Sequence, residues 1–214
     1  TRNLLAILSQ AGQGIRQFIY VSTTGVYGDR QGQWVNECSS VQPRTDRAHR
    51  RVDAERQIRA WAVRHHVATT ILRVPGIYAD NRLPLDRIER ATPALLPEED
   101  VYTNHIHADD LARILFHALF KGKNQRLMNV CDESQMKMGD YFDAVAHAFG
   151  LLPVPRVSFD QLKLQVDPML LSFMSESRRM SPRRLPELRV GLQYPTVNDF
   201  LAFTSKYLLS QRND

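Results

Sequence analysis

The sequence predicts an α/β fold in which a parallel sheet is followed by a small carboxy-terminal lobe. Short apolar or β-branched runs alternate with helical patterns over the first part of the chain, the order that crossover units produce. Apolar residues make up 43% of the 214 residues, which is enough for a hydrophobic core. The length suits one large domain or one and a half.

The bulk composition restricts the class of protein. No run approaches the roughly 18 apolar residues of a membrane span, and no signal peptide is evident. Cys38 and Cys131 give neither a disulfide framework nor a metal spacing, so we expect a reduced, cytoplasmic protein. The net charge is +5, but the arginines are spread over many segments, so we expect no nucleic-acid partner from charge alone.

The elements follow one another in a clear order. The first helix is expected to end at Gly12 and Gly14. Thr45 or Asp46 can cap the long helix after the first strand, and Asp109 or Asp110 the helix that follows His107. The expected elements are helix 1–11, strand 16–24, helix 46–65, strand 67–74, short helix 83–91, a strand through residue 107 and the helix after it, strand 126–132, helix 136–150, helical segment 159–174 and helix 197–209.

Two loops are the expected ligand site. In parallel sheets, ligands bind beyond the carboxyl ends of the strands. The hydroxyls of Ser22, Thr23 and Thr24 end the first strand, and Pro75-Gly76 ends the second. Such hydroxyls can polarise a substrate oxygen, but they can also satisfy loop backbone groups only.

These motifs together resemble a known family. STTGVYGD (22–29), an Arg-rich helix with Ala54-Glu55, ILRVPGIY (71–78), NHIHADDLA (104–112) and LMNVCD (127–132) are similar, in order and spacing, to the extended short-chain dehydrogenase/reductase superfamily. The closest resemblance is to its NAD-dependent epimerase/dehydratase group and atypical members. The resemblance implies a Rossmann-like fold, NAD or NADP as cofactor, and hydride transfer on a sugar-like substrate, with nucleotide sugars as one class.

The resemblance also assigns roles to residues. Thr23 stands where the family has the Ser or Thr that polarises the substrate oxygen. Ser22, Thr23, Arg51, Pro75, Gly76 and Ile77 are expected at the cofactor, and Thr24, Arg47, Tyr78 and Asn104 at the substrate. The family continues its Pro-Gly segment with Tyr-Gly-Pro, whereas this chain has Tyr78-Ala79-Asp80, and Ala lacks the φ freedom of Gly.

The catalytic pair departs from the family pattern. If Glu55 matches the family glutamate, Arg47 takes the place of the acid/base tyrosine and Arg51 that of the lysine four residues later. Arginine is effectively always charged, so Arg47 cannot shuttle a proton. The two arginines, on the stripe of Ala54 and Ile58, can face inward and clamp a carboxylate or phosphate, or they can turn to solvent.

The substitute for the missing tyrosine stays open. Tyr27 is the best local candidate for the catalytic base, since it closely follows the first strand, and the resemblance implies that it lines the pocket. His49 titrates near neutral pH but lies about 160° from Arg51 around the helix. A water molecule is the third candidate.

Two further segments invite alternatives. His105 and His107 point to one face of a strand, but no third metal ligand converges on them, so we expect no metal. ESRRMSPRR (176–184) is either a solvated basic loop or a surface for an anionic substrate. Some atypical relatives bind RNA, but no aromatic residue is interleaved here for base stacking.

The family's Gly-rich phosphate turn is not present. Ala11-Gly12-Gln13-Gly14 follows a helix and precedes a strand, the reverse of what that turn requires. We therefore expect the later part of a longer protein, with the first strands of the sheet missing. Residues 1–134 would belong to the cofactor domain, with a substrate-loop insertion near 78–104, and residues 135–214 mainly to a substrate lobe.

The sequence predicts an NAD(P)-dependent epimerase/dehydratase-like oxidoreductase with a small-molecule substrate. The alternatives are a non-catalytic dinucleotide-binding sensor and an RNA-associated family member. No membrane partner is expected, a homodimer stays open, and the sequence does not separate NAD from NADP.

Overall fold

Three parallel strands form the central sheet. The computed structural model describes residues 1–10 and 14–211, with side chains as far as residue 204. The strand order is β1 (Gln17–Thr23), β3 (Ala68–Val74) and β8 (Arg126–Asn129), and Thr23 is in register with Val74. The predicted α/β class is confirmed. The expected stop at Gly12 lies outside the described residues.

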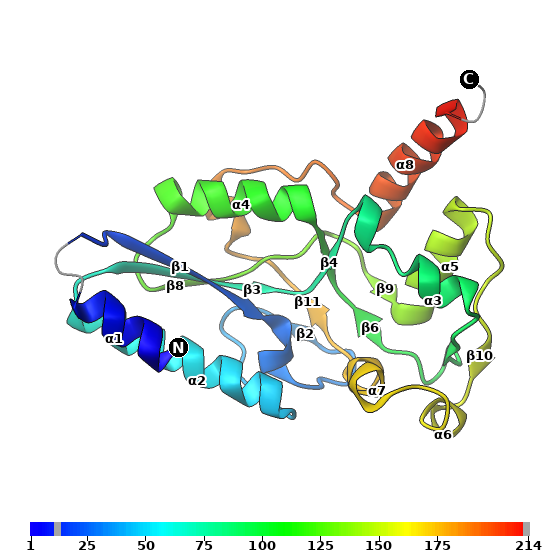
Figure 1. Cartoon of the computed structure of the whole chain (residues 1–214), viewed down its shortest axis with the longest axis horizontal. Helices are drawn as coiled ribbons and strands as arrows, with labels where there is room; N and C mark the ends of the chain where they lie inside the picture. Colours follow the sequence, from blue (N-terminus) through cyan, green and yellow to red (C-terminus); the bar gives the residue numbers. More distant parts are fainter. Residues whose placement is uncertain (11–13, 212–214) are drawn as a thin grey trace.

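Helices cover both faces of this sheet. Figure 1 shows α1 (Arg2–Gln10) and α2 (Asp46–Arg64) on one face and α4 (Ala108–Lys121) on the other. Thr45 caps α2, as one of the two predicted candidates, and its side chain accepts a hydrogen bond from the Ala48 N–H at 3.2 Å. Among the described residues, no helix has the length and apolar character needed to cross a bilayer.

The cap of α4 was predicted wrongly. His107 precedes this helix, and its Nδ1 accepts a hydrogen bond from the Asp109 N–H at 3.2 Å. Asp110 lies inside the first turn and is fully buried, where its carboxylate accepts bonds from the backbone N–H groups of Gln193 and Tyr194. Asp110 therefore ties α4 to the carboxy-terminal segment.

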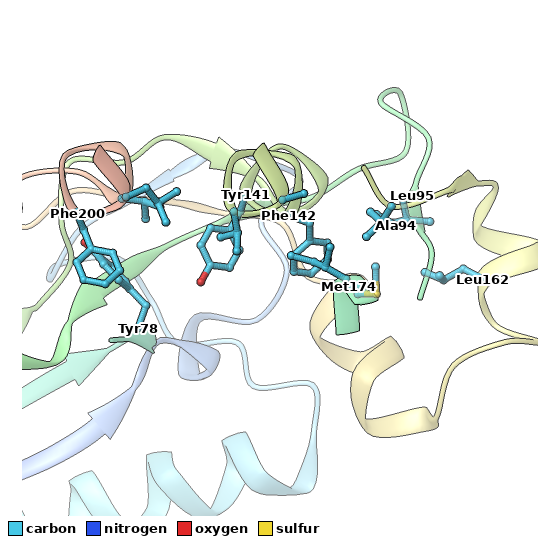
Figure 2. Packing of buried hydrophobic residues seen from close by; sticks show 14 of the residues in the cluster. Tyr78, Ala94, Leu95, Tyr141, Phe142, Leu162, Met174 and Phe200 are labelled. Atoms are coloured by element: carbon cyan, nitrogen blue, oxygen red, sulfur yellow. The ribbon is translucent and has the colours of Figure 1, made fainter. Parts of the chain in front are cut away.

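A second group of elements forms a lobe beside the sheet. Its hydrophobic core, drawn in Figure 2, runs from Tyr78 and Phe200 through Tyr141 and Phe142 to Leu162. The predicted helical segment 159–174 is two helices, because Asp167-Pro168 starts a new one. The lobe helices are α3 (Leu85–Glu89), α5 (Met138–Ala148), α6 (Phe159–Leu162), α7 (Pro168–Met174) and α8 (Val197–Gln211).

Short strand pairs join the lobe to the sheet. Gly76 at the start of β4 is in register with His105 at the start of β7, so the segment after β3 lies beside the segment before α4. Ala79 is extended, with φ −166°, so it causes no strain where the family has glycine. The pairs are β4 (Gly76–Tyr78) with β7 (His105–His107), β2 (Trp34–Val35) with β11 (Arg179–Met180), β5 (Ala94–Leu95) with β10 (Arg156–Val157), and β6 (Tyr102–Thr103) with β9 (Met136–Lys137).

The carboxy-terminal segment also returns to the sheet. Leu185 and Leu188, in the 3₁₀ helix η3 (Leu185–Leu188), pack in the core formed by β3, β8 and α4. The two parts of the chain therefore share a hydrophobic core, and the domain division at residue 134 stays a prediction.

A buried ion pair joins α2 to the sheet. Arg73 of β3 donates to both carboxylate oxygens of Glu55, at 3.1 and 2.7 Å, and the Ser22 hydroxyl donates to the same carboxylate at 2.6 Å. All three residues are buried. Burial lowers the pKa of Arg73, but the contacts with Glu55 outweigh it and leave that pKa raised. The pair thus links α2, β1 and β3 at the carboxyl ends of the strands.

We expect Glu55→Gln to lower the free energy of unfolding by about 3–5 kcal/mol, because it leaves the buried Arg73 guanidinium without a counter-charge. Urea unfolding of both proteins measures the difference. Arg56→Gln, at the exposed neighbouring position, is the control and should change stability by about 0.5 kcal/mol or less. A loss below about 1 kcal/mol for Glu55→Gln would contradict this account of the pair.

Candidate functional site

A cavity of about 340 Å³ opens at the carboxyl ends of β1 and β3, between the sheet and the lobe. Its volume lies at the lower end of the range of small-molecule sites. The sheet contributes strand ends and the lobe contributes aromatic side chains. The lining residues are Thr23, Thr24, Gly25, Thr45, Arg47, Ala48, Pro75, Gly76, Arg87, Tyr102, Thr103, Asn104, His105, Met138, Tyr141, Phe142, Leu170, Ser172, Phe173, Glu176 and Arg178.

Six of the predicted site residues meet in this cavity. Both strand ends are present, as expected for a parallel sheet, together with one arginine of α2 and one residue of the segment before β7. The six are Thr23, Thr24, Arg47, Pro75, Gly76 and Asn104. Their roles toward cofactor and substrate stay predictions, although their convergence is the arrangement that those roles require.

Ser22 and Tyr27 lie outside the cavity lining. Ser22 is buried against α2 and donates to Glu55, since side chains of a strand alternate and only Thr23 reaches the cavity. Tyr27 ends the 3₁₀ turn η1 (Thr24–Tyr27) and is fully buried. Its hydroxyl donates to Asn129 Oδ1 at 2.7 Å, and burial raises its pKa. The expectation that Tyr27 lines the pocket is therefore wrong.

Gly28 explains how Tyr27 turns into the core. Its φ of +65° is in the left-handed region, and a Cβ there would lie 2.0 Å from the Gln42 carbonyl oxygen. Only glycine fits this close approach. The chain therefore turns sharply after Tyr27 and directs its ring under the Arg73 guanidinium, 4.7 Å from the ring centroid.

Three further predicted residues also lie away from the cavity. Arg51 is exposed and donates to the Tyr20 hydroxyl at 3.0 Å. Ile77 packs against the core of the sheet, and Tyr78 belongs to the lobe core behind His105. Gly76, the first residue of β4, is the last residue of this strand to face the cavity. The two residues that follow it pack into the cores of the sheet and of the lobe.

The two arginines of α2 differ in environment. Arg47 lines the cavity, with its guanidinium carbon 4.4 Å from the centroid of the Phe173 ring. Both Arg47 and Arg51 are exposed residues; of the two alternatives that the sequence left open, Arg51 turns outward to Tyr20, whereas Arg47 lines the cavity. The Arg47 side chain lies at the cavity rather than in the hydrophobic core. His49 is also exposed and does not line the cavity.

Asn104 holds the carboxy-terminal segment beside the cavity by two hydrogen bonds. Its amide donates to the Arg178 carbonyl oxygen and accepts from the Met180 N–H, both at 2.9 Å. Arg178 itself lies in the cavity wall and pairs with Glu176 at 2.9 Å. Segment 176–184 is thus part of the wall and of strand β11, so its interpretation as a solvated loop is wrong.

Several wall residues carried no clear signal in the sequence. His105, which the sequence raised as a metal ligand and rejected, is buried beside the Tyr141 ring at 4.2 Å between centroids, and burial lowers its pKa to about 4. Arg87 and Phe142 lie in α3 and α5, two helices that are far apart in the sequence but pack against each other in the fold. No residue pattern within α3 marks Arg87 as a ligand residue.

A buried carboxyl lies behind this wall. Asp132 accepts a hydrogen bond from the Ser134 N–H at 2.9 Å, while its other oxygen has no hydrogen-bond partner in the described part of the chain. Burial raises the pKa of Asp132 to about 7. Residues 1–10 and 14–204 contain no group of three or more His, Cys, Asp or Glu that could hold a metal ion.

Together, the parallel sheet, the helices on both faces and the cavity at the strand ends define a Rossmann-like α/β protein. The sequence profile of the NAD dependent epimerase/dehydratase family matches residues 1–131. The chain belongs to this family, within the extended short-chain dehydrogenase/reductase superfamily that the sequence resembles.

Solved structures agree with this assignment. A functionally unknown conserved protein from Silicibacter pomeroyi is 31% identical, with a TM-score of 0.82 over 95% of this chain. The dTDP-glucose 4,6-dehydratase of Bacillus anthracis, in complex with NAD, gives 15% and 0.73 over 98%. A human epimerase family protein, SDR39U1, with NADPH gives 14% and 0.74 over 95%. The last two show the fold alone.

The chain spans only part of these proteins. It covers 70% of the Silicibacter protein, 66% of the dehydratase and 70% of the human protein. A search of curated proteins found no match.

We expect Asp132→Asn to change the pH dependence of stability. Because its pKa is raised, Asp132 binds its proton more tightly in the folded chain than in the unfolded chain. The stability that this proton adds is therefore fully present below the unfolded pKa of 3.8 and is lost as the pH rises through about 7. The stability of Asp132→Asn relative to the native chain should therefore increase between pH 4 and pH 7, by up to about 4 kcal/mol.

Urea unfolding across this pH range tests the expectation, and the difference between the two proteins removes the opposite contribution of His105. Asp86→Asn, at an exposed position, is the control and should give a flat difference. A flat difference for Asp132→Asn would refute the raised pKa.

Proposed function

We propose that this chain carries the substrate cavity and the nicotinamide half of an NAD(P)-dependent oxidoreductase. It would act by hydride transfer on a sugar-like substrate, with nucleotide sugars as one class. The observation that carries this proposal is the convergence of Thr23, Arg47 and Gly76, from three different elements, on one cavity at the strand ends.

The cavity wall suits a flat, polar ring. Gly76 is exposed, and a Cβ there would lie 3.4 Å from both the Asn104 carbonyl oxygen and the His105 ring. Bare backbone at Pro75-Gly76 and the hydroxyl of Thr45 would hold the nicotinamide end of the cofactor, while the Thr23 hydroxyl stays available for the substrate oxygen. The dinucleotide, when bound, supplies or accepts the hydride. The choice between NAD and NADP stays open.

Thr23 and Arg47 would stabilise charge on the substrate oxygen. The Thr23 hydroxyl can donate to that oxygen, as the family's polarising residue does. Arg47 stands at the tyrosine position, where its fixed charge can stabilise an alkoxide but cannot move a proton. Arg51, now bound to Tyr20, would have to leave that hydroxyl to hold the ribose.

A proton acceptor is still required. Tyr27 is excluded by its burial outside the cavity, and His49 by its exposure on the other side of α2. His105 lines the cavity and is uncharged at neutral pH, because burial lowers its pKa to about 4. A pKa this low makes the imidazole a weak base at neutral pH, so His105 would only form a hydrogen bond at the substrate oxygen, and a water molecule, the remaining candidate, would accept the proton.

A non-catalytic dinucleotide sensor is the second candidate. It is favoured by the arginines at the tyrosine and lysine positions. The third alternative, an RNA-associated protein, is disfavoured, because three of the four arginines of segment 176–184 make internal contacts: Arg178 with Glu176, Arg179 with the Gly32 carbonyl oxygen, and Arg184 with that of Leu127.

We expect Thr23→Val to leave NAD(P)H binding within about twofold of the native protein and to lower turnover roughly 100-fold, the scale of losing one donor to a developing oxyanion. Binding is measured by fluorescence titration and turnover with a panel that includes UDP-glucose and dTDP-glucose, which are named with related structures. Thr92→Val, outside the cavity, should change neither.

The outcomes separate the candidate functions. Turnover that survives Thr23→Val contradicts the assigned role of this threonine. Cofactor binding without turnover on any substrate supports the sensor. Absence of binding to either cofactor, in a protein that also contains the family's Gly-rich phosphate turn, overturns the proposal.

A further inference from the structure

The cavity wall carries an excess of positive charge. Three arginines and one glutamate line it, and His105 is uncharged at neutral pH. Arg178 is compensated by Glu176, at 2.9 Å. Arg47 and Arg87 are not, since no carboxylate of the described residues lies within ion-pair distance of either guanidinium. The wall therefore presents two positive charges without ion-pair partners among the described residues.

Arg87 is the more enclosed of the two. It projects from α3, and its guanidinium carbon lies 4.3 Å from the centroid of the Phe142 ring. Its Nη2 donates to the Met174 sulfur at 3.1 Å, while its Nε is buried and has no hydrogen-bond partner in the described structure. A thioether is a weak acceptor, so most of the donor capacity of Arg87 is unused.

Arg87 nevertheless stays charged. Burial lowers its pKa to about 10, although the negative charge of Asp167 opposes this shift. At neutral pH a partly enclosed guanidinium without a carboxylate is costly, unless a ligand supplies the counter-charge. The planar fork of five donors suits a carboxylate or a phosphate.

We propose that the cavity is an anion-binding site in which Arg87 is the receptor, so that the substrate carries a carboxylate or phosphate group. The statement about the substrate rests on the proposed function, whereas the anion site stands on the cavity alone. Arg47, across from the lobe on α2, supplies the second positive charge. The cavity volume of about 340 Å³ requires that the anion be compact.

A purely structural role for Arg87 makes a different prediction. Stacking on Phe142 could serve only to hold α3 against α5. That role accounts for the ring contact but not for the buried Nε without an acceptor. It also predicts that Arg87 can be replaced without any effect on ligand binding, provided that packing is kept.

The test is calorimetric titration of the native chain with inorganic phosphate and with malonate, at constant ionic strength. We expect binding of at least one anion. Arg87→Met, which keeps the apolar stem over Phe142, should weaken it at least tenfold, the scale of a charge-assisted bond. Arg87→Lys, which keeps the charge, should lie between the two. Arg90→Met, at an exposed position just after α3, should bind as the native chain does.

Each result of the titrations supports or refutes the anion site. Phosphate binding without malonate binding assigns the site to phosphorylated compounds, and the reverse assigns it to carboxylic acids. Equal affinity in the native chain and Arg87→Met overturns the proposal, as does the absence of binding to both anions in the folded native chain. If Arg87→Met does not fold, Arg87→Lys is the deciding variant. An affinity for the anions equal to that of the native chain would then show that the guanidinium group has no role in binding, and would overturn the proposal.

An NADH titration of the same samples separates this inference from the proposed function. Anion binding that depends on Arg87 leaves the anion site standing whatever the NADH result, and the absence of NADH binding to a protein that also contains the family's Gly-rich phosphate turn refutes the oxidoreductase. NADH binding without anion binding refutes the anion site and leaves the oxidoreductase standing.

Discussion

The buried Glu55–Arg73 pair is the interaction on which the arrangement of the cavity depends. It joins the middle of α2 to β3, and through Ser22 it reaches the end of β1. Ser22 directly precedes Thr23, and Arg73 lies three residues before Gly76. The pair therefore fixes the two strand ends that form the cavity floor, and it fixes the first turns of α2 above them. A charged pair of this kind is costly to desolvate, and losing either partner leaves an uncompensated charge.

The cavity is completed by the lobe, whose aromatic core supports the charged residues. Phe142 and Phe173 each carry an arginine on one ring face, and Tyr141 packs beside His105. Cations on aromatic faces in a partly enclosed site stay charged while keeping donors free for a ligand. The arginine at the tyrosine position changes the chemistry accordingly, because it stabilises negative charge but moves no proton. In this account, the arginines recognise the anion, and proton transfer is left to a water molecule.

The sequence predicted the order of elements, the parallel sheet and the two strand ends, because periodicity and turn residues are local properties. It placed Thr23, Pro75 and Gly76 correctly at the cavity for the same reason. It failed for Tyr27, whose direction depends on a 3₁₀ turn and on the close approach of Gly28 to Gln42.

Long-range packing explains the other failures. Arg87 could not be found, since its surroundings are made by α5 and α7, which lie more than fifty residues away in the chain. The two alternatives for segment 176–184 could not be separated from the sequence for the same reason, because the partners of three of its arginines lie near residues 28–34 and 102–127.

The central claim is that the cavity at the ends of β1 and β3 holds both the nicotinamide and an anionic substrate. The most direct measurement is a crystal structure of the protein with NADH and with the anion that binds more tightly in titrations. The account predicts the nicotinamide in contact with Thr23 and Gly76, and the anion bonded to the Arg87 guanidinium. A dinucleotide bound outside this cavity, or an anion that leaves Arg87 without a contact, would contradict it.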